Sequence, residues 1–564
     1  MNKHVLLALT SAFALIFTAK AQNAHFAYFT YTGHDTRFDK PVDDSREYLN
    51  PILAGFAPDP SICRKGDTYY LVNSSFTFFP GVPIYTSKDL LHWQQLGYVL
   101  DRPSQLPLTG QRVSGGIYAP DIKYNEKNKT FYMITTNVGR GNFFVKTKDP
   151  AQGWSEPIYL PQVGGIDPSF FFDKDGRAYI VNNDAPATEP RYNGERSIWL
   201  HEFDVKGDSI VGEQKEILRS GTHVQPNPIW IEGPHLYRIG KWYYLMCAEG
   251  GTGEWHSEVI LRAKSPMGPW EEYTEGNPIL TQRQGLSPDR PDIVTSAGHA
   301  DLVQTPGGDW YAVFLGCRPY QADYYNTGRD TYMLPVDWHD GWPTILEKGK
   351  AVPTVVTLTS VPSQQPSTPT AASSQLTTGN FTYTDRFDGN RLHLRWNFLR
   401  QPSDFYTLDR QGLTITPLPG SIMKRDLLSA IFCRQQHTDF MAETELTFTP
   451  SRSGHLAGLV LLQNEDYNFV FGLTLLDGKT ALTLTRAEKQ QVLMASAPVD
   501  ADRPLRLKIA GHGRYYDFLF ASGSDEWHTL ALGVDAVNLS THRSGGFIGA
   551  CIGLYATTGN GENK

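Results

Sequence analysis

The stretch Pro58-Asp59-Pro60-Ser61-Ile62 begins a phrase that decides the fold, because variants of it recur along the chain. The phrase continues through the hairpin signal Lys65-Gly66-Asp67 and ends on the aromatic run Tyr69-Tyr70-Leu71-Val72. Further copies occupy 120–133, 167–180, 232–244 and 299–312, and a carboxylate leads four of the five copies. A period of roughly 45 to 70 residues is typical of a blade array.

Each copy predicts two adjacent antiparallel strands, because alternating apolar runs flank a turn signal such as Gly307-Gly308-Asp309. Five such units around one axis give a five-bladed β-propeller. Radial repetition brings equivalent strand ends to one central mouth. We therefore expect the leading carboxylates of different copies to lie together there.

The 564-residue chain is longer than one core usually supports, which predicts more than one domain. Alternating segments such as 443–448 and 505–509 predict a β-sandwich in the C-terminal part, so the fold class is all-β. We expect a lead-in over 22–50 that packs on the propeller, the propeller over 51–352, a Ser/Thr/Pro-rich linker over 361–379 and the sandwich over 380–564.

The composition and the N-terminus limit the partners and the location. A net charge of −8 without a Lys/Arg cluster argues against a nucleic acid partner. A basic start, an apolar run over 5–18 and the motif Ala19-Lys20-Ala21 predict a signal peptide over 1–21, cleaved near Ala21. That run is too short to span a bilayer, so we expect an exported protein, periplasmic or secreted, without membrane insertion. The five widely spaced cysteines predict buried free thiols.

Asp59, Asp167 and Glu232 stand at matching places in three copies of the phrase. An isolated Asp-Pro is usually a turn former, since Asp initiates turns for local reasons. The repetition of Asp-Pro-Ser in two copies weakens that explanation. A metal site is a second interpretation, although no cluster of His or Asp supplies a ligand set by itself.

The motifs at 58–61, 165–169 and 231–234 resemble the three acidic motifs of glycoside hydrolase family 43, whose members are five-bladed propeller enzymes, largely β-xylosidases and α-L-arabinofuranosidases. The region after the linker is similar to the concanavalin-like β-sandwich of the family's β-xylosidase branch. The resemblance implies that Asp59 is the general base and Glu232 the general acid. It implies that Asp167 raises the pKa of Glu232 and orients it. An inverting hydrolysis needs such a pair.

The same resemblance implies roles for other residues. Phe76 and Tyr118 match aromatic residues of the sugar pocket, and many relatives have Trp where Tyr118 stands. Arg329, in Gly328-Arg329-Asp330, matches an active-site arginine. His299, in Gly298-His299-Ala300-Asp301, matches a central-channel residue that often lies beside a hydrated Ca²⁺, so we expect a structural cation there and no required cofactor. Asp121 also leads a copy, and the family pattern makes it structural.

The function that the resemblance implies is exo-acting, inverting release of terminal β-D-xylose from xylan- or arabinoxylan-derived oligosaccharides. An α-L-arabinofuranosidase acting on arabinoxylan or arabinan is the closest alternative, because the two pentoses present similar hydroxyls. A retaining β-fructosidase is disfavoured, since the Asn-Asp-Pro and Glu-Cys motifs of that group are missing. A non-catalytic glycan-binding propeller is an alternative of another class, against which the three retained acidic motifs count.

Overall fold

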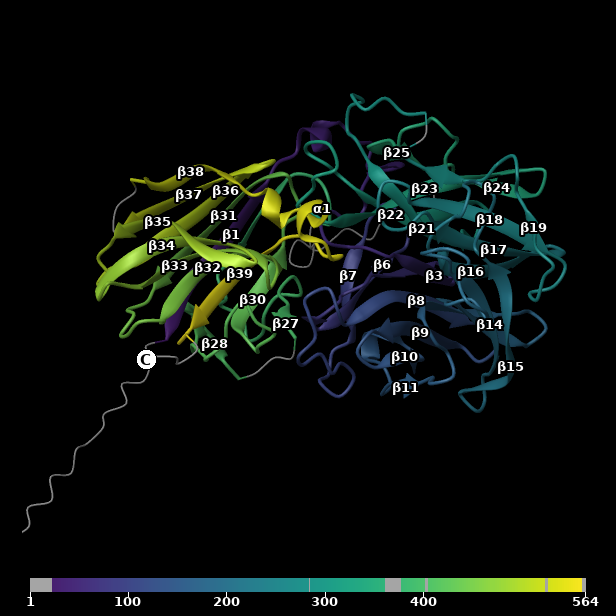
Figure 1. Ribbon diagram of the computed structural model, residues 1–564, viewed down its shortest axis with the longest axis horizontal. Helices are drawn as coiled ribbons and strands as arrows, with labels where there is room; N and C mark the ends of the chain where they lie inside the picture. The colour runs from purple at the N-terminus through teal and green to yellow at the C-terminus, as the bar shows by residue number, and fades with distance from the viewer. Residues whose placement is uncertain (1–22, 284, 361–376, 401–403, 523–525, 560–564) are drawn as a thin grey trace, which may run out of the picture.

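The computed structural model describes residues 23–283, 285–360, 377–400, 404–522 and 526–559. The predicted signal peptide and most of the predicted linker lie outside the described residues. Figure 1 shows two β-rich bodies side by side, with hardly any helix. The described part of the chain contains no helix long and apolar enough to cross a membrane. All five cysteines are free and buried, as the sequence predicts.

The larger body is a five-bladed β-propeller, which confirms the predicted fold. Each blade holds its strands in chain order, and each copy of the sequence phrase forms the first two. The blades are β3 (Ser61–Lys65), β4 (Thr68–Val72), β6 (Gly81–Ser87) and β7 (Gln94–Leu100); β8 (Ile117–Asn125), β9 (Thr130–Asn137), β10 (Gly141–Thr147) and β11 (Ile158–Tyr159); β12 (Ile166–Phe172), β13 (Ala178–Asp184), β14 (Ser197–Asp204) and β15 (Ser209–Arg219); β16 (Glu232–Ile239), β17 (Trp242–Glu249), β18 (Ser257–Ala263), β19 (Glu271–Glu272) and β20 (Leu280–Thr281); β21 (Thr295–Gln304), β22 (Trp310–Cys317), β23 (Arg329–His339) and β24 (Trp342–Thr344).

The first strands of the blades pack against one another around the axis, and β21 lies beside β3 to close the ring. Asp121 joins three blades, because its carboxylate accepts hydrogen bonds from the Ser61 hydroxyl at 3.1 Å and from the Phe170 backbone N–H at 2.8 Å. Buried carboxylates that accept several hydrogen bonds hold their neighbours in place. Asp121 therefore has the structural position that we expected for it.

The smaller body is a sandwich of two antiparallel sheets. One sheet has the order β28 (Tyr406–Asp409), β29 (Gly412–Ile415), β1 (Ala24–Gly33), β31 (Asp439–Thr447), β36 (Leu505–His512), β37 (Tyr515–Ser522) and β38 (His528–Asp535), with β26 (Phe381–Asp385) also on β1. The other has the order β30 (Ser429–Arg434), β39 (Cys551–Thr557), β32 (Leu456–Asn464), β33 (Tyr467–Leu476), β34 (Lys479–Glu488) and β35 (Gln490–Pro498). A continuous apolar core lies between the two sheets.

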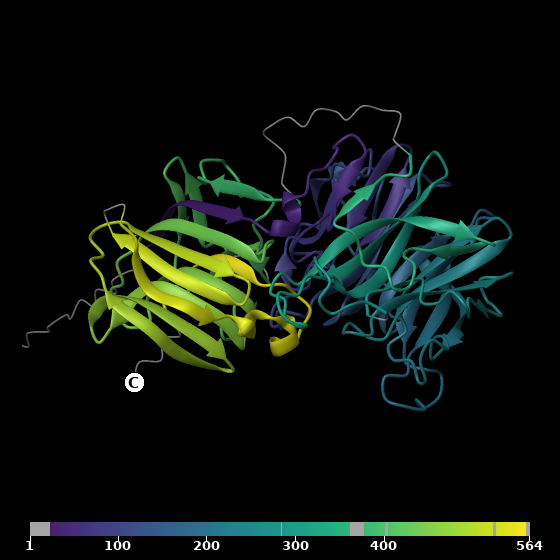
Figure 2. The same cartoon turned by 90° about the horizontal axis from the view of Figure 1, so that it is seen from above.

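The prediction that residues 22–50 pack on the propeller is wrong for the first strand. The strand β1 lies inside the sandwich sheet, as the purple strand in the left-hand body of Figure 2 shows, and Phe26, Phe29 and Tyr31 are buried in the sandwich core. A β-bulge shifts its register against β31 between Phe26 and Phe29, which breaks the alternation that would have marked a strand. Further along the described lead-in, the short β2 (Glu47–Leu49) pairs on the propeller side, with β25 (Val355–Thr357).

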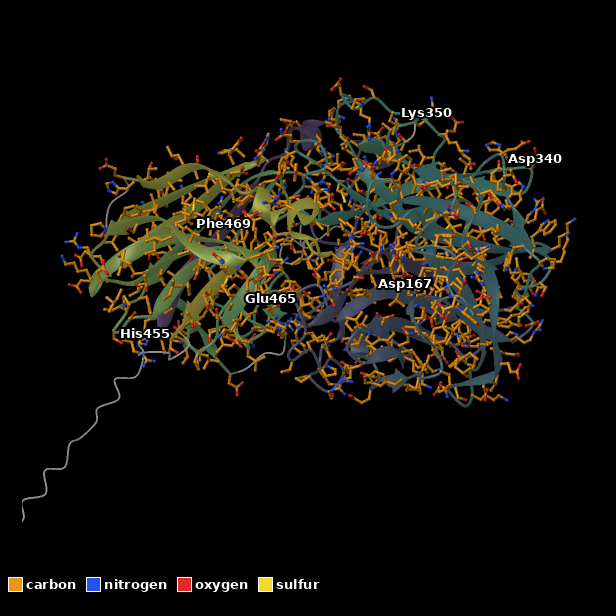
Figure 3. All side chains as sticks on the ribbon, in the orientation of Figure 1. Asp167, Asp340, Lys350, His455, Glu465 and Phe469 are labelled. Atoms are coloured by element: carbon orange, nitrogen blue, oxygen red, sulfur yellow. The ribbon has the colours of Figure 1, made fainter. Side chains whose placement is uncertain are left out.

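Two buried arginines hold the bodies together. Arg318 of the propeller donates to Asp330 at 2.9 and 3.0 Å and to Asp35 of the lead-in at 2.7 Å. Arg400, on the sandwich side, pairs with Glu465, which Figure 3 shows at the sandwich edge facing the propeller, and donates to the Gln111 carbonyl at 2.7 Å. Such buried pairs tolerate little displacement, because a lost partner leaves a buried charge.

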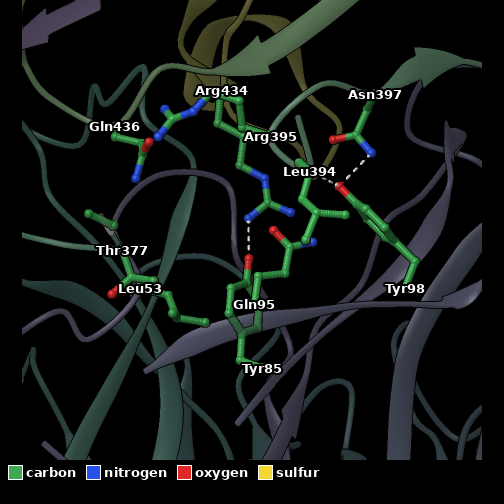
Figure 4. A pocket seen from close by; sticks show the side chains of 11 residues that line it. Leu53, Tyr85, Gln95, Tyr98, Thr377, Leu394, Arg395, Asn397, Arg434 and Gln436 are labelled. Atoms are coloured by element: carbon green, nitrogen blue, oxygen red, sulfur yellow. Dashed lines mark hydrogen bonds between the residues drawn. The ribbon is translucent and has the colours of Figure 1, made fainter. Parts of the chain in front are cut away.

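The boundary also contains a strand pair and a cavity. The strands β5 (Phe78–Phe79) and β27 (Phe398–Leu399) pair across it. Figure 4 shows a cavity between the bodies, where Asn397 donates to the Tyr98 hydroxyl at 3.0 Å. The helical turns of the described chain are α1 (Thr541–Ser544) and the 3-10 turns η1 (Thr36–Asp39), η2 (Pro150–Gln152) and η3 (Val537–Leu539). The sandwich thus has a fixed position beside the propeller mouth.

Candidate active site

One pocket at the propeller mouth brings together every residue for which the sequence analysis expected a role in catalysis, sugar binding or cation binding. Asp59, Asp167 and Glu232 line it, although they come from three blades. The other lining residues are Phe76, Tyr118, Ala119, Ile166, Thr252, His299, Arg329 and Phe547. The cavity between the bodies in Figure 4 contains none of these side chains, so it is a separate feature.

Irregular backbone at the start of the inner strands turns the site residues into the mouth. Register shifts occur in equivalent places, after Ile166, after Glu232 and on both sides of Gly298, the neighbour of His299. Asp59, Asp167 and His299 have φ values of 50°, 55° and 55°, in the left-handed region. Bulges and left-handed residues re-aim side chains and are concentrated at functional sites. The repeated phrase therefore encodes a repeated backbone bend as well as a pair of strands.

Gly233 is required at its place beside Glu232. Its φ is 54°, and a Cβ added there would lie 2.6 Å from the His299 ring. Its backbone N–H donates to Oδ2 of Asp167 at 3.3 Å. The Glu-Gly-Pro motif thus allows Glu232, Asp167 and the channel histidine to approach one another closely.

Asp59 has the surroundings of an ionised carboxylate. Arg329 donates from Nη1 to its Oδ1 at 2.9 Å, and the Ser74 hydroxyl donates to Oδ2 at 2.6 Å. The Nδ1 atom of His299 lies 3.5 Å from the same Oδ1. Burial alone would raise the pKa of Asp59, but the Arg329 guanidinium, His299 and the Ser74 hydroxyl together hold it below the usual value.

Glu232 and Asp167 have the opposite character. Burial, followed by the negative charges of Asp167 and Asp59, raises the pKa of Glu232 well above its usual value. Burial and the charge of Asp59 raise the pKa of Asp167 to about 7. Like charges held close in a buried pocket cannot all ionise at neutral pH. The pocket therefore combines an ionised carboxylate with a protonated one.

Three aromatic rings form the wall of the pocket, and one of them comes from the sandwich. The ring centroids of Phe76 and Tyr118 are 5.3 Å apart, and that of Phe547 is 6.1 Å from Phe76 and 5.7 Å from Tyr118. The Phe547 carbonyl accepts a hydrogen bond from Nη2 of Arg329 at 3.3 Å. The sandwich thus completes the wall of the propeller pocket.

Sequence reasoning missed Phe547, which lies in a different domain from the acidic motifs. The one local signal is its setting in Gly545-Gly546-Phe547-Ile548-Gly549. A Cβ added to Gly549 would lie 2.2 Å from the Thr327 carbonyl oxygen, so only glycine allows this loop to approach the propeller backbone. Glycines that flank an aromatic residue can mark such an approach, but they do not identify the partner.

Two sets of polar groups near the pocket bear on a cation, one among the inner strands and one between the fourth and fifth blades. Asp121, His235 and Asp301 have ligand atoms within 4.8 Å of one another, yet Nζ of Lys123 lies 2.7 Å from Asp121 and 2.8 Å from Asp301. An internal ammonium therefore already binds both carboxylates of this cluster. Oε1 of the buried Glu258, in contrast, has no hydrogen-bond partner among the described residues, while its Oε2 accepts from the Ala300 N–H at 3.0 Å. Carboxylate oxygens of this kind fit a hydrated Ca²⁺.

The site can perform acid–base chemistry at a sugar. Glycoside hydrolysis by the common carboxylate mechanism uses one carboxylic acid with a raised pKa and one ionised carboxylate, and the pocket provides both. Aromatic walls with a few convergent polar groups are typical of ligand pockets. Fold and site together define a glycoside hydrolase built on a five-bladed propeller.

Comparison with known proteins identifies the family. Residues 48–343 match the family described as "Glycosyl hydrolases family 43", and residues 384–564 match "Beta xylosidase C-terminal Concanavalin A-like domain". The chain therefore belongs to glycosyl hydrolase family 43 and is a glycosidase, as its sequence motifs indicated. Both matches agree with the propeller and the sandwich of the structure.

Relatives match nearly the whole chain. A xylosidase/arabinosidase of Butyrivibrio fibrisolvens is 39% identical over 522 residues, which cover 91% of this chain and 96% of the relative. A non-reducing end α-L-arabinofuranosidase of Bacteroides ovatus is 35% identical, with 92% of each chain covered. A crystal structure of a GH43_12 protein from a capybara gut metagenome has a TM-score of 0.86 at 42% identity, and covers 95% of this chain and 100% of its own.

Proposed function

We propose that the protein is an exo-acting, inverting β-xylosidase that releases terminal β-D-xylose from xylan- or arabinoxylan-derived oligosaccharides. The observation that carries the proposal is the pairing of Asp59, held ionised by Arg329, with Glu232, held protonated by burial and by Asp167. The names of the relatives, xylosidase/arabinosidase and beta-xylosidase among them, support a pentosidase.

In the proposed reaction Asp59 removes a proton from a water molecule, whose oxygen attacks the anomeric carbon of the terminal sugar. Glu232 donates its proton to the glycosidic oxygen as the bond to that carbon breaks, so the leaving group departs neutral. Asp167 keeps the pKa of Glu232 high, and Arg329 keeps that of Asp59 low. Proton exchange with water then restores the starting protonation states.

Exo-action is supported by the shape of the site. The aromatic wall of Phe76, Tyr118 and Phe547 closes the pocket on the side of the sandwich. A closed pocket accepts a chain end, whereas an internal sugar of a polymer would need a cleft open at both ends. We therefore assign the terminal sugar to this pocket.

The second candidate, α-L-arabinofuranosidase activity, is favoured by the name of the Bacteroides ovatus relative, a non-reducing end α-L-arabinofuranosidase. Purified protein should be assayed in parallel on p-nitrophenyl β-D-xylopyranoside and p-nitrophenyl α-L-arabinofuranoside, with Asp59→Asn as the inactive control. Faster turnover of the xyloside supports the proposal. Turnover of the arabinoside alone would transfer the assignment to arabinose, and inactivity on both with glycan binding intact would favour a non-catalytic propeller.

We further propose a structural Ca²⁺ in the central channel and action outside the cytoplasm. Glu258, through Oε1, and His299, through water, would hold the cation, which would contribute positive charge and order to the channel. The apolar run over 5–18 and the Ala19-Lys20-Ala21 motif support export, with cleavage near Ala21. Mass spectrometry of the protein from its native cell would show whether the mature chain begins after Ala21.

A further inference from the structure

An exposed tryptophan beside Glu232 has no part in the steps described above. Trp230 precedes Glu232 by two residues, and 40% of its surface is exposed. Its φ is 52°, a left-handed value that bulky side chains rarely adopt. Backbone strain of this kind persists where the surroundings enforce it, and it is concentrated at ligand-binding sites. An exposed aromatic ring on strained backbone next to a proton donor suggests a role in substrate contact.

Trp230 does not itself line the pocket, but it packs on a loop that reaches the pocket. Its backbone N–H donates to the Gly194 carbonyl at 2.9 Å. A Cβ added to Gly251 would lie 3.8 Å from Cδ1 of Trp230, so the ring packs against that loop. The next residue, Thr252, lines the pocket together with Glu232. The tryptophan therefore continues the pocket wall outward.

The ring is held in place by a circuit of contacts that returns to the strand of Glu232. The Arg196 guanidinium lies 5.1 Å from the ring centroid of Trp230. Arg196 donates from Nε and Nη2 to Oδ1 of Asn183, at 3.0 and 2.8 Å. Asn183 in turn donates from Nδ2 to the carbonyl of Ile231, between Trp230 and Glu232. Because Arg196 covers one face of the ring, the exposed area lies on the rest of it.

We propose that Trp230, backed by Arg196, binds the first sugar of the leaving group in a xylo-oligosaccharide. The inference rests on the proposed function, because the proton from Glu232 goes to the glycosidic oxygen and thus fixes the side on which the leaving sugar lies. The C–H face of a pyranose packs well on an indole, which presents a large rigid apolar surface. The intact enzyme should then prefer substrates whose leaving group is a sugar ring.

The test compares two substrates of the Trp230→Asn variant. Asparagine tolerates the left-handed backbone, so the substitution removes the ring without adding strain. The leaving group of xylobiose is a sugar, whereas that of β-D-xylopyranosyl fluoride is a fluoride ion. The value of kcat/KM on xylobiose should fall about tenfold, the upper end for the loss of a stacking contact, while that on the fluoride stays unchanged. Tyr515→Ala, which removes a side chain of a residue 50% exposed on the sandwich, is the matched control.

Equal losses on both substrates, or no loss on either, would overturn the proposal that Trp230 binds the leaving sugar. A binding measurement tests the same contact independently, because it involves no turnover. In an Asp59→Asn background, calorimetry with xylose and with xylobiose should give tighter binding of the disaccharide, and Trp230→Asn should remove that advantage. An advantage that survives the substitution would contradict the proposal.

Failure of the proposed function has a different signature, since the intact enzyme would then hydrolyse neither xylosyl substrate. If it cleaved α-L-arabinofuranosides instead, the same binding comparison would be made with arabinobiose and arabinose. The ring of Trp230 should again make the disaccharide bind more tightly than the monosaccharide. Equal binding of the two sugars would overturn the proposed contact between Trp230 and the leaving sugar.

Discussion

Replacing Arg329 with Gln should move the acidic limb of the pH–activity profile to higher pH. Burial alone would raise the pKa of Asp59, and the Arg329 guanidinium is the largest influence against it. The two side chains are each 7% exposed and meet at 2.9 Å. A hydrogen bond to a charged group contributes about 1.5–3 kcal/mol. Because one pKa unit corresponds to about 1.4 kcal/mol, its loss should raise the pKa of Asp59 by about one to two units.

The sign follows from the role proposed for Asp59. Only the ionised carboxylate accepts a proton from water, so activity is present above its pKa and is lost as the pH falls through it. In the intact enzyme that pKa is held below the ordinary value of 3.8, so the acidic limb should lie correspondingly low. Without Arg329, burial and the nearby Asp167 prevail, and the limb should rise.

The assay is the pH dependence of kcat/KM on xylobiose, which reports the pKa values of the free enzyme. Arg329→Lys keeps the positive charge and should shift the limb less than Arg329→Gln. Arg177→Gln, which removes an exposed ion pair with Asp175 outside the pocket, is the control and should leave the profile unchanged. A lower rate at every pH with an unmoved acidic limb would refute the reasoning and leave Arg329 as a substrate contact.

Three further predictions concern other parts of the site. Asp167→Asn removes one of the charges that raise the pKa of Glu232. Since Glu232 must be protonated to act, the alkaline limb of the profile should move to lower pH, and an unmoved limb would contradict the influence of Asp167 on Glu232. Phe547→Ala should raise KM for xylobiose by a factor of about 2 to 10 with little change in Tm, and an unchanged KM would show that the sandwich does not contribute to binding. Chelation should lower Tm, and excess Ca²⁺ should restore it by mass action. If metal-free protein had the same Tm as protein with Ca²⁺, the proposal of a structural cation would be wrong.

The blades and the carboxylates could be predicted because the same local rules act in each copy of the phrase. Alternating apolar residues around a Gly/Asp turn specify a strand pair wherever they occur. An Asp or Glu at the same place in different copies is then expected at the same end of the axis. Asp59, Asp167 and Glu232 do meet there in one pocket. Asp121, which leads the second copy, binds Ser61 and the Phe170 N–H instead, and only the family resemblance set it apart.

The errors and omissions arise where a segment depends on partners far away in the chain. The strand β1 pairs with β31, more than 400 residues later, and its bulge hides the strand period. Phe547 enters the pocket only because the sandwich is fixed beside the propeller by contacts such as those of Arg318. Neither the pairing partner nor the domain placement has a local signature in the sequence. The two domains had to be placed in space before these residues could be connected with the site.

The configuration of the first sugar released tests the central claim most directly. A water activated by Asp59 on one face of the sugar, with Glu232 protonating the leaving oxygen on the other, must invert the anomeric carbon. Proton NMR during hydrolysis of a β-xyloside, recorded faster than mutarotation, should show α-D-xylose as the first product. If β-D-xylose formed first, the reaction would proceed through a covalent intermediate, and the roles proposed for Asp59 and Glu232 would be wrong.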